Sequence, residues 1–139
     1  MAQVNWYTDE EVQELFKEEK RTVIKLHSAD WCKHCQNVKA MLDKHAHFIN
    51  NNWYAIFVDE TNNKKSNVSL YPTTMIWTKS GTNVMIEGAF NEELLTALKL
   101  DINKAIEKVS EKHKKWGQIV YLNDNALLSQ EAEKKLEAE

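Results

Sequence analysis

Two cysteines, Cys32 and Cys35, are the residues of this chain whose type and spacing are best suited to chemistry. Sulfurs two residues apart can close a disulfide bond, and they exchange it with other disulfides when their reactivities differ. Because the chain has only these two cysteines, a structural framework of several bridges is excluded. A lone pair of this kind in a reducing compartment predicts redox catalysis or metal binding.

The position of the pair in the sequence predicts unequal reactivity. A helix is expected to run from Cys32 to about His45, which places the first sulfur at the helix N-terminus, where backbone N–H groups stabilise a thiolate. Lys33 and His34 are potentially cationic and favour the thiolate further. Cys32 is therefore expected to be accessible and to have a thiol pKa below the reference pKa of about 8.5. Cys35 is expected one turn further in and more buried.

Zinc binding is an alternative interpretation of the same segment. A Cys/His-rich stretch supplies six possible ligands: His27, Cys32, His34, Cys35, His45 and His47. Structural zinc sites usually combine two ligand pairs at defined spacings, whereas these histidines are scattered along a predicted strand and a predicted helix. A buried, inert cysteine pair is the other alternative. The spacing favours thiol exchange over both, and we expect no metal.

Strands alternate with helices around the cysteines. Apolar, β-rich runs predict strands at 4–7, 22–26, 53–58, 73–78 and 84–87, the last two forming a hairpin. Helices are expected after Thr8, where Glu11 completes a capping box, from Cys32, at 64–68 and, as one long final helix, after Asn91. This order predicts an α/β fold with a central mixed sheet flanked by helices on both faces.

Two motifs resemble the thioredoxin family. Ala29-Asp30-Trp31-Cys32-x-x-Cys35 resembles the segment that leads into the active site of that family. Val68-x-x-Tyr71-Pro72-Thr73 resembles its loop with a cis-proline beside the sulfurs, and Pro72 is the only proline of the chain. The resemblance covers roughly residues 4–109 and implies a thioredoxin fold.

The resemblance also implies roles for individual residues. Cys32 would be the attacking cysteine and Cys35 the resolving one. Trp31 would shape the docking surface, Pro72 would align the substrate backbone, and the backbone of Tyr71 would pair with an extended substrate segment.

Several positions depart from the usual thioredoxin pattern. Leu26 stands where many thioredoxins have a buried Asp that handles a proton for the resolving cysteine, and His27 and Ser28 follow it in place of aromatic residues. The Lys-His pair between the cysteines replaces Gly-Pro, and His34 together with Tyr71-Pro72-Thr73 is closer to protein disulfide isomerase domains. Asp59, at the end of a predicted strand, is hypothesised to tune the site by accepting a hydrogen bond from the Trp31 indole.

These features predict a thiol-disulfide oxidoreductase that acts on protein substrates with disulfides or thiols. Its redox group would be the Cys32–Cys35 disulfide, with no other cofactor, and a reductase or glutathione would recycle it. The alternative is a binding module that docks on a partner and uses its thiols little; Leu26 leaves room for this interpretation.

Composition narrows the possible partners and the location. The 139 residues are 42% hydrophobic and 28% charged, with a formal net charge of -3, which fits an ordinary globular domain. The charge balance shows no basic excess for nucleic acid, and no apolar run is long enough for a membrane span. The N-terminus lacks the pattern of a secretory signal, so a cytoplasmic protein is expected.

The C-terminal region extends beyond the resemblance. We expect a thioredoxin-like domain at 1–115 and a C-terminal extension at 116–139, with Gly117 suited to cap the final helix. The extension would hold a short apolar segment, Ile119–Leu122, and a helix in which Leu128 and Leu136 share a face. The apolar segment would either fold back onto the domain or form a docking surface for a partner or a second copy.

Overall fold

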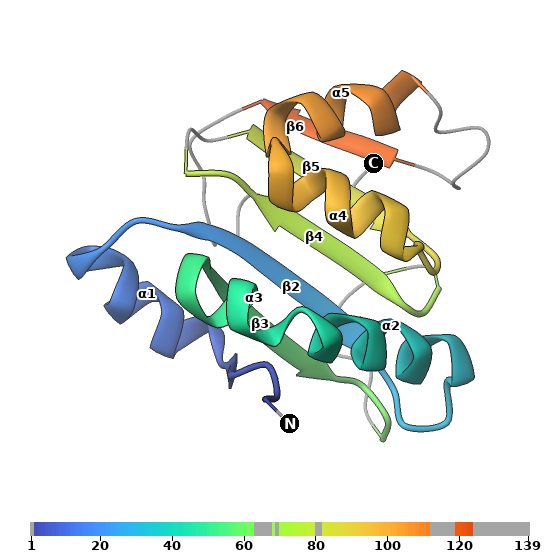
Figure 1. Cartoon of the computed structure of the whole chain (residues 1–139). Coiled ribbons are helices and arrows are strands. Elements are labelled where there is room, and N and C mark those ends of the chain that lie inside the picture. Colours follow the sequence, from blue (N-terminus) through green and yellow to red (C-terminus); the bar gives the residue numbers. More distant parts are fainter. Residues whose placement is uncertain (1, 63–67, 69, 80–81, 112–118, 124–139) are drawn as a thin grey trace.

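The computed structural model describes residues 2–62, 68, 70–79, 82–111 and 119–123. Helices and strands alternate through most of this part of the chain (Figure 1). The elements are β1 (Trp6–Tyr7), α1 (Asp9–Glu18), β2 (Thr22–Ser28), α2 (Lys33–Lys44), α3 (Ala46–Asn52), β3 (Trp53–Asp59), β4 (Thr73–Trp77), β5 (Thr82–Glu87), α4 (Glu92–Leu100), α5 (Ile102–Glu111) and β6 (Ile119–Asn123).

The strands form a single mixed sheet in the order β1-β3-β2-β4-β5-β6. β1, β3 and β2 run parallel, whereas β4, β5 and β6 each pair antiparallel with the strand before them in that order. In the centre of the sheet, Leu26 lies between Phe57 of β3 and Thr74 of β4. The predicted mixed α/β sheet is confirmed.

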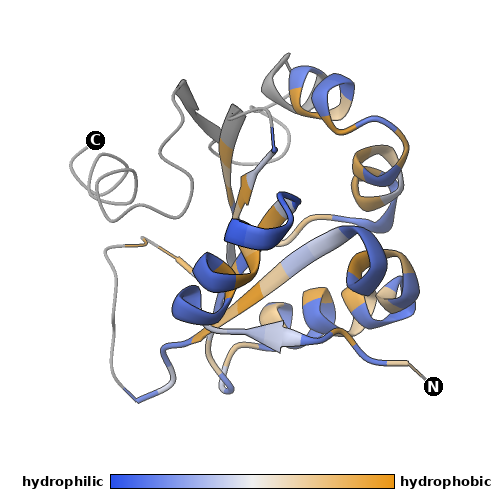
Figure 2. Ribbon diagram, turned by 90° about the vertical axis from the view of Figure 1, so that its left-hand side faces the viewer, coloured by the Kyte–Doolittle hydropathy of each residue, from blue (hydrophilic) through white to orange (hydrophobic). Residues whose placement is uncertain are grey.

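Each face of the sheet buries its own hydrophobic cluster. On one face, Val12 of α1 packs with Val23 and Ile56 of the sheet. On the other face, Leu26 and Ile76 pack against residues from α2 to α5, including Leu42 and Leu95. Figure 2 shows hydrophobic residues along the strands and mainly hydrophilic residues along large parts of the helices. Helices thus cover both faces, as predicted.

The first helix begins with the capping box predicted from the sequence. The Thr8 hydroxyl accepts a hydrogen bond from the Glu11 backbone N–H at 3.1 Å, and the Thr8 N–H donates to Oε1 of Glu11 at 2.9 Å. Three acidic residues, Asp9, Glu10 and Glu11, fill the first turn. They complement the positive end of the helix dipole.

A helix that the sequence did not predict follows α2. Asn50, Asn51 and Asn52, a residue type that is common in turns, form the last turn of α3. Ala46 and Ile49 of α3 are buried in the core, so tertiary packing outweighs the low helix propensity of asparagine. The Asn50 side chain is also satisfied outside the helix, because its oxygen accepts from the Asn5 N–H at 2.8 Å.

The long final helix expected after Asn91 is divided in two. Asn91 caps α4 as predicted, with its side-chain oxygen accepting from the Leu94 N–H at 3.0 Å. Asp101 then adopts an extended backbone, with φ −155° and ψ 97°, and ends α4. Its carboxylate accepts from the Lys104 N–H at 3.2 Å and so caps the start of α5. Aspartate competes for backbone N–H groups in this way, which favours a new N-terminus over a continuous helix.

The segment beyond α5 contributes a strand to the same sheet. β6 pairs antiparallel with β5, from Thr82 opposite Asn123 to Ile86 opposite Ile119. The apolar segment Ile119–Leu122, predicted either to fold back or to dock a partner, therefore lies along an edge of the sheet. The predicted helix beyond residue 123, the cap at Gly117 and most of the short helix predicted at 64–68 lie outside the described residues. Every helix in the described ranges is too short or too polar to cross a membrane.

Candidate active site

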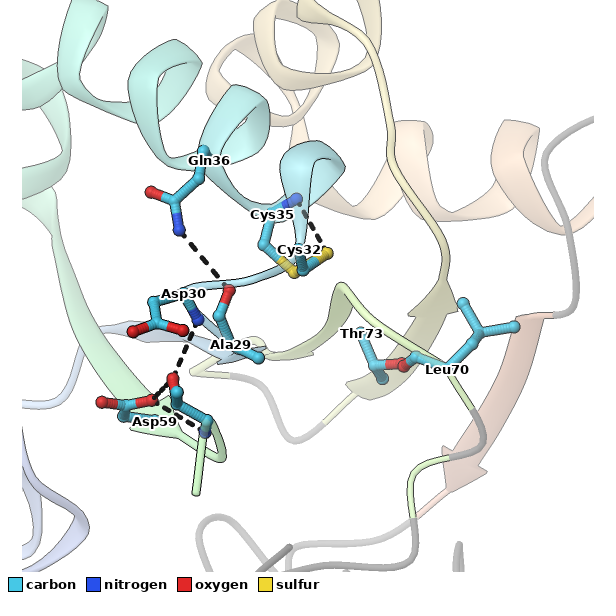
Figure 3. The surroundings of a disulfide bond; sticks show 9 residues. Ala29, Asp30, Cys32, Cys35, Gln36, Asp59, Leu70 and Thr73 are labelled. Atoms are coloured by element: carbon cyan, nitrogen blue, oxygen red, sulfur yellow. Dashed lines mark hydrogen bonds between the residues drawn. A yellow bond between two sulfur atoms is a disulfide. The ribbon is translucent and has the colours of Figure 1, made fainter. Parts of the chain in front are cut away.

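Cys32 and Cys35 form a disulfide at the start of α2, with their Cα atoms 5.2 Å apart (Figure 3). Cys32 is the N-cap residue of the helix, in an extended backbone conformation, and its Sγ accepts a hydrogen bond from the Cys35 N–H at 3.2 Å. The first sulfur thus takes the place of the oxygen that usually caps a helix. The predicted helix start is confirmed.

The turn into the helix is ordered by one carbonyl group. The carbonyl oxygen of Ala29 accepts from the Cys32 N–H at 3.2 Å and from the side-chain amide of Gln36 at 3.4 Å (Figure 3). These bonds tie the end of β2 to the first turn of α2. They hold the Cys32 backbone in the conformation that an N-cap requires.

Both sulfur-bearing residues are buried in the oxidised protein. Cys32 is 7% exposed and Cys35 is fully buried. The expectation of an accessible Cys32 is therefore wrong for this state, because Ala29 and Tyr71 pack around the disulfide in one cluster. The expected order holds, with the first cysteine closer to the surface than the second. Lys33 and His34 are exposed on the first turn of α2, and their tuning role stays a prediction.

Trp31, directly before Cys32, lies on the surface and is 65% exposed. Its indole N–H donates to the carbonyl oxygen of Thr61 at 3.3 Å, so the hypothesis that Asp59 is the acceptor named the wrong residue. The Asp59 carboxylate instead accepts from the backbone N–H and the hydroxyl of Thr61. The Thr61 hydroxyl also accepts from the Asp30 N–H at 2.8 Å. Asp59 therefore orders the residue that holds Trp31.

The second predicted motif lies on the other side of the disulfide. The Tyr71–Pro72 peptide bond is cis, and the Pro72 carbonyl accepts from the Gly88 N–H at 2.8 Å. Gly88 has a φ of 91°, a conformation that favours glycine. The Thr73 hydroxyl donates to the Leu70 carbonyl at 2.7 Å and closes the loop (Figure 3). The motifs predicted at Cys32 and at Pro72 are thus brought together by the sheet.

The rings of Trp31 and Tyr71 contact each other. Their centroids are 5.7 Å apart and their planes are at 88°, an edge-to-face contact. Such a contact is favourable for aromatic rings. We call Trp31 and Tyr71 the aromatic pair: Trp31 directly precedes Cys32, and Tyr71 packs against the cysteine cluster.

Glu60 is a site residue that the sequence reasoning missed. Its carboxylate is fully buried, and Oε2 lies 2.9 Å from Nδ1 of His27, whose side chain is only 1% exposed. Burial is the main reason that the pKa of Tyr71 lies above its ordinary value, and the neighbouring Glu60 carboxylate raises this pKa further. The one signal in the sequence was that His27, like Lys25, is ionisable and lies on a β-rich run of largely apolar residues.

Leu26 is fully buried in the core beneath α2, in the same cluster as Val38 and Leu42 of that helix. Its strand neighbours are Phe57 and Thr74, so neither directly paired residue brings a carboxylate to this position. The position that supplies a proton acceptor in many thioredoxins is therefore apolar in this protein.

The residues weighed as zinc ligands are dispersed. His27 is paired with Glu60, whereas His45 lies at the α2–α3 junction and bonds to Glu92 and Lys99 of α4. Across the ranges that the structure describes, three or more His, Cys, Asp or Glu side chains nowhere gather in a way suited to a metal ion.

Comparison with known proteins agrees with this geometry. The family model for thioredoxin matches residues 3–100. Chloroplastic thioredoxin z is 19% identical with a TM-score of 0.60, over 75% of this chain and 97% of that one. DsbH oxidoreductase is 15% identical with a TM-score of 0.55, over 76% and 86%. The germline-specific thioredoxin Deadhead from Drosophila melanogaster is 15% identical with a TM-score of 0.53, over 70% and 96%. No curated protein sequence matches significantly.

The family match includes every part of the site described above. It spans β1 to α4 and therefore contains the disulfide, the Tyr71–Pro72 loop and the end of β3. The solved structures share the fold at low sequence identity. On the family match and this fold, the chain belongs to the thioredoxin family.

Proposed function

We propose that this protein is a dithiol–disulfide oxidoreductase that acts on disulfides of other proteins. The observation that carries the proposal is the Cys32–Cys35 disulfide at the N-terminus of α2. The exposed Trp31 and the Tyr71 ring that it contacts support a protein substrate, because they provide aromatic surface next to the sulfurs.

The reaction begins in the reduced protein. The Cys32 thiolate attacks one sulfur of a substrate disulfide, a mixed disulfide forms, and the second substrate sulfur leaves as a thiolate. Cys35 then gives its proton to the departed thiolate and attacks Sγ of Cys32. The Cys32–Cys35 bond forms, the first substrate sulfur is released, and two electrons have passed to the substrate. The same steps in reverse make a substrate disulfide.

The aromatic pair and the loop at Tyr71–Pro72 would receive the substrate. An extended substrate segment would pair with the backbone of Tyr71, beside Pro72, as a short form of strand addition. Trp31 would cover the segment from the other side. A reductase or glutathione would return the Cys32–Cys35 disulfide to the dithiol.

Single-turnover reduction of insulin tests the proposal. The pre-reduced full chain should reduce one insulin disulfide per molecule, with Cys32 and Cys35 oxidised as measured by thiol counting. Cys32→Ser is the control and should leave insulin oxidised. A wild-type chain that keeps both thiols in the presence of insulin would favour the binding-module alternative.

A further inference from the structure

The chain leaves β2 and β3 at the same edge of the sheet. Ser28 and Asp59, the last residues of these two parallel strands, are paired in register. The residues after β2 lead to Cys32, whereas the residues after β3 lead to Thr61. Strand pairing therefore brings Thr61 next to the segment that precedes the first cysteine, although the two lie about thirty positions apart in the sequence.

A tight turn carries the chain from β2 to the helix that holds the cysteines. The Cys32 N–H donates to the Ala29 carbonyl at 3.2 Å, so Asp30 and Trp31 are the two central residues of the turn. Thr61 bonds to both of them. Its hydroxyl oxygen accepts from the Asp30 N–H at 2.8 Å, and its carbonyl oxygen accepts from the Trp31 indole N–H at 3.3 Å. One residue thus holds the centre of the turn that precedes the first sulfur.

The side-chain contacts of Thr61 require a hydroxyl group, because one oxygen atom both donates and accepts. The hydroxyl donates to the Asp59 carboxylate and accepts from the Asp30 N–H (Figure 3). A carboxylate can only accept and an apolar side chain can do neither, whereas serine and threonine do both. The same Asp59 carboxylate accepts from the Thr61 N–H at 3.0 Å. This bond fixes the backbone of Thr61 next to the carbonyl that holds Trp31.

Trp31 is the residue through which this arrangement would act on a substrate. It directly precedes Cys32, is 65% exposed, and contacts the Tyr71 ring, which packs against the cysteine cluster. An exposed side chain that is already held in one orientation loses less conformational entropy when a partner binds to it. A protein substrate presents a segment that can contact this ring, whereas a small disulfide can react with the Cys32 sulfur alone.

We propose that Thr61 is a positioning residue, which favours protein disulfides over small disulfides by holding Trp31 of the aromatic pair. The inference rests on the proposed function, because it concerns how the substrate of that reaction is received. It predicts that the Thr61 hydroxyl acts through Trp31, so that loss of the hydroxyl has no further effect once the indole is absent.

The test compares full-length variants that differ in this hydroxyl. Thr61→Val removes the hydroxyl and keeps the shape of the side chain, whereas Thr61→Ser keeps the hydroxyl. Thr96→Val is the matched control, because Thr96 is an exposed threonine on α4. Trp31→Phe, alone and combined with Thr61→Val, tests the route through the indole. Each pre-reduced protein reacts once with insulin and once with 5,5′-dithiobis(2-nitrobenzoate), and the ratio of the two rate constants is measured.

We expect Thr61→Val to lower the insulin-to-small-disulfide ratio about three- to tenfold, the range that one lost hydrogen bond produces. Thr61→Ser and Thr96→Val should keep the wild-type ratio, and the double variant should fall no further than Trp31→Phe. A wild-type ratio in a folded Thr61→Val, whether both rate constants are unchanged or fall together, would overturn the inference. A Thr61→Ser as impaired as Thr61→Val, or a double variant equal to the product of the single effects, would also overturn it.

The NMR signal of the Trp31 indole N–H separates positioning from general destabilisation. In ¹⁵N-labelled protein, the signal is assigned by its absence from the spectrum of Trp31→Phe. In Thr61→Val it should move toward the position of an indole in the unfolded chain, whereas Thr61→Ser should leave it in place. An unmoved signal in Thr61→Val would contradict the inference. If wild type itself fails to reduce insulin, the proposed function fails; if wild type reduces insulin and Thr61→Val keeps its ratio, this inference alone fails.

Discussion

The backbone N–H of Cys35 points at Sγ of Cys32 from 3.2 Å, within the first turn of α2. This contact makes a sulfur atom the cap of a helix whose first turn holds no acidic residue. When the disulfide is reduced, the same N–H group and the helix dipole favour negative charge on Cys32. The arrangement explains why the first sulfur, rather than the second, is the nucleophile in the proposed reaction.

The first prediction is that the reduced Cys32 is reactive at neutral pH. Its alkylation rate with iodoacetamide should level off below about pH 8, the region in which a free thiol is still largely protonated. His34→Pro should slow alkylation at pH 7, because it removes a potential cation. The urea-unfolded chain is the control. A rate in the folded protein that still rises from pH 8 to 9 would contradict the prediction.

The second prediction concerns the resolving step. Cys35→Ser should accumulate mixed disulfides between Cys32 and insulin, because the second sulfur is no longer present to release the substrate. Non-reducing electrophoresis and mass spectrometry would detect the adduct. Cys32→Ser should form none. Equal adduct formation by both variants would show that the two sulfurs are interchangeable.

The third prediction concerns the buried apolar residue beneath the site. Leu26→Asp should speed insulin reduction, because it places a proton acceptor where the structure has a fully buried Leu. The substitution should also lower the free energy of unfolding by more than about 2 kcal/mol, since it buries a carboxylate. Leu26→Asn is the control for size and polarity. A folded Leu26→Asp that is no faster than Leu26→Asn would remove this explanation.

The fourth prediction is a loss of stability in alkali. Burial holds the pKa values of Tyr54 and Tyr71 above 10.0, so between pH 10 and their folded values the unfolded chain releases protons that the folded chain retains. Stability should therefore fall as the pH rises above 10. In Tyr71→Phe and Tyr54→Phe, the free energy of unfolding measured in urea should fall less between pH 8 and pH values above 10 than it does in wild type. An identical decrease in wild type and both variants would refute the prediction.

The fifth prediction separates stability from chemistry. Thr8→Ala should lower the free energy of unfolding by about 1 kcal/mol, because it removes the cap of α1. Thr8→Ser keeps a hydroxyl and should stay close to wild type. Single-turnover insulin reduction should be unchanged in both, since α1 covers the face of the sheet opposite α2. A slower reaction in Thr8→Ala would show that this end of the sheet is coupled to the site.

Local features were readable from the sequence because each depends on residues a few positions apart. The cap at Thr8, the helix start at Cys32 and the cap at Asn91 all involve partners three residues away. Alternating strands and helices also predicted the mixed sheet. The resemblance in two short motifs also predicted the Tyr71–Pro72 loop at the site, where Tyr71 packs against the cluster of the two cysteines.

Only the tertiary structure decided which distant side chains meet. Pairing of β2 with β3 and β4 brings His27 and Glu60 together across 33 positions, and no local pattern links the two residues. The structure also places the Thr61 carbonyl, and not the Asp59 carboxylate, as the acceptor of the Trp31 indole N–H. These two residues are two positions apart at the end of β3, so the turn after the strand decides which of them the indole reaches. The burial of Cys32 also follows from packing. Sequence spacing determines local hydrogen bonds, whereas strand register and burial, which act across the whole chain, determine the rest of the site.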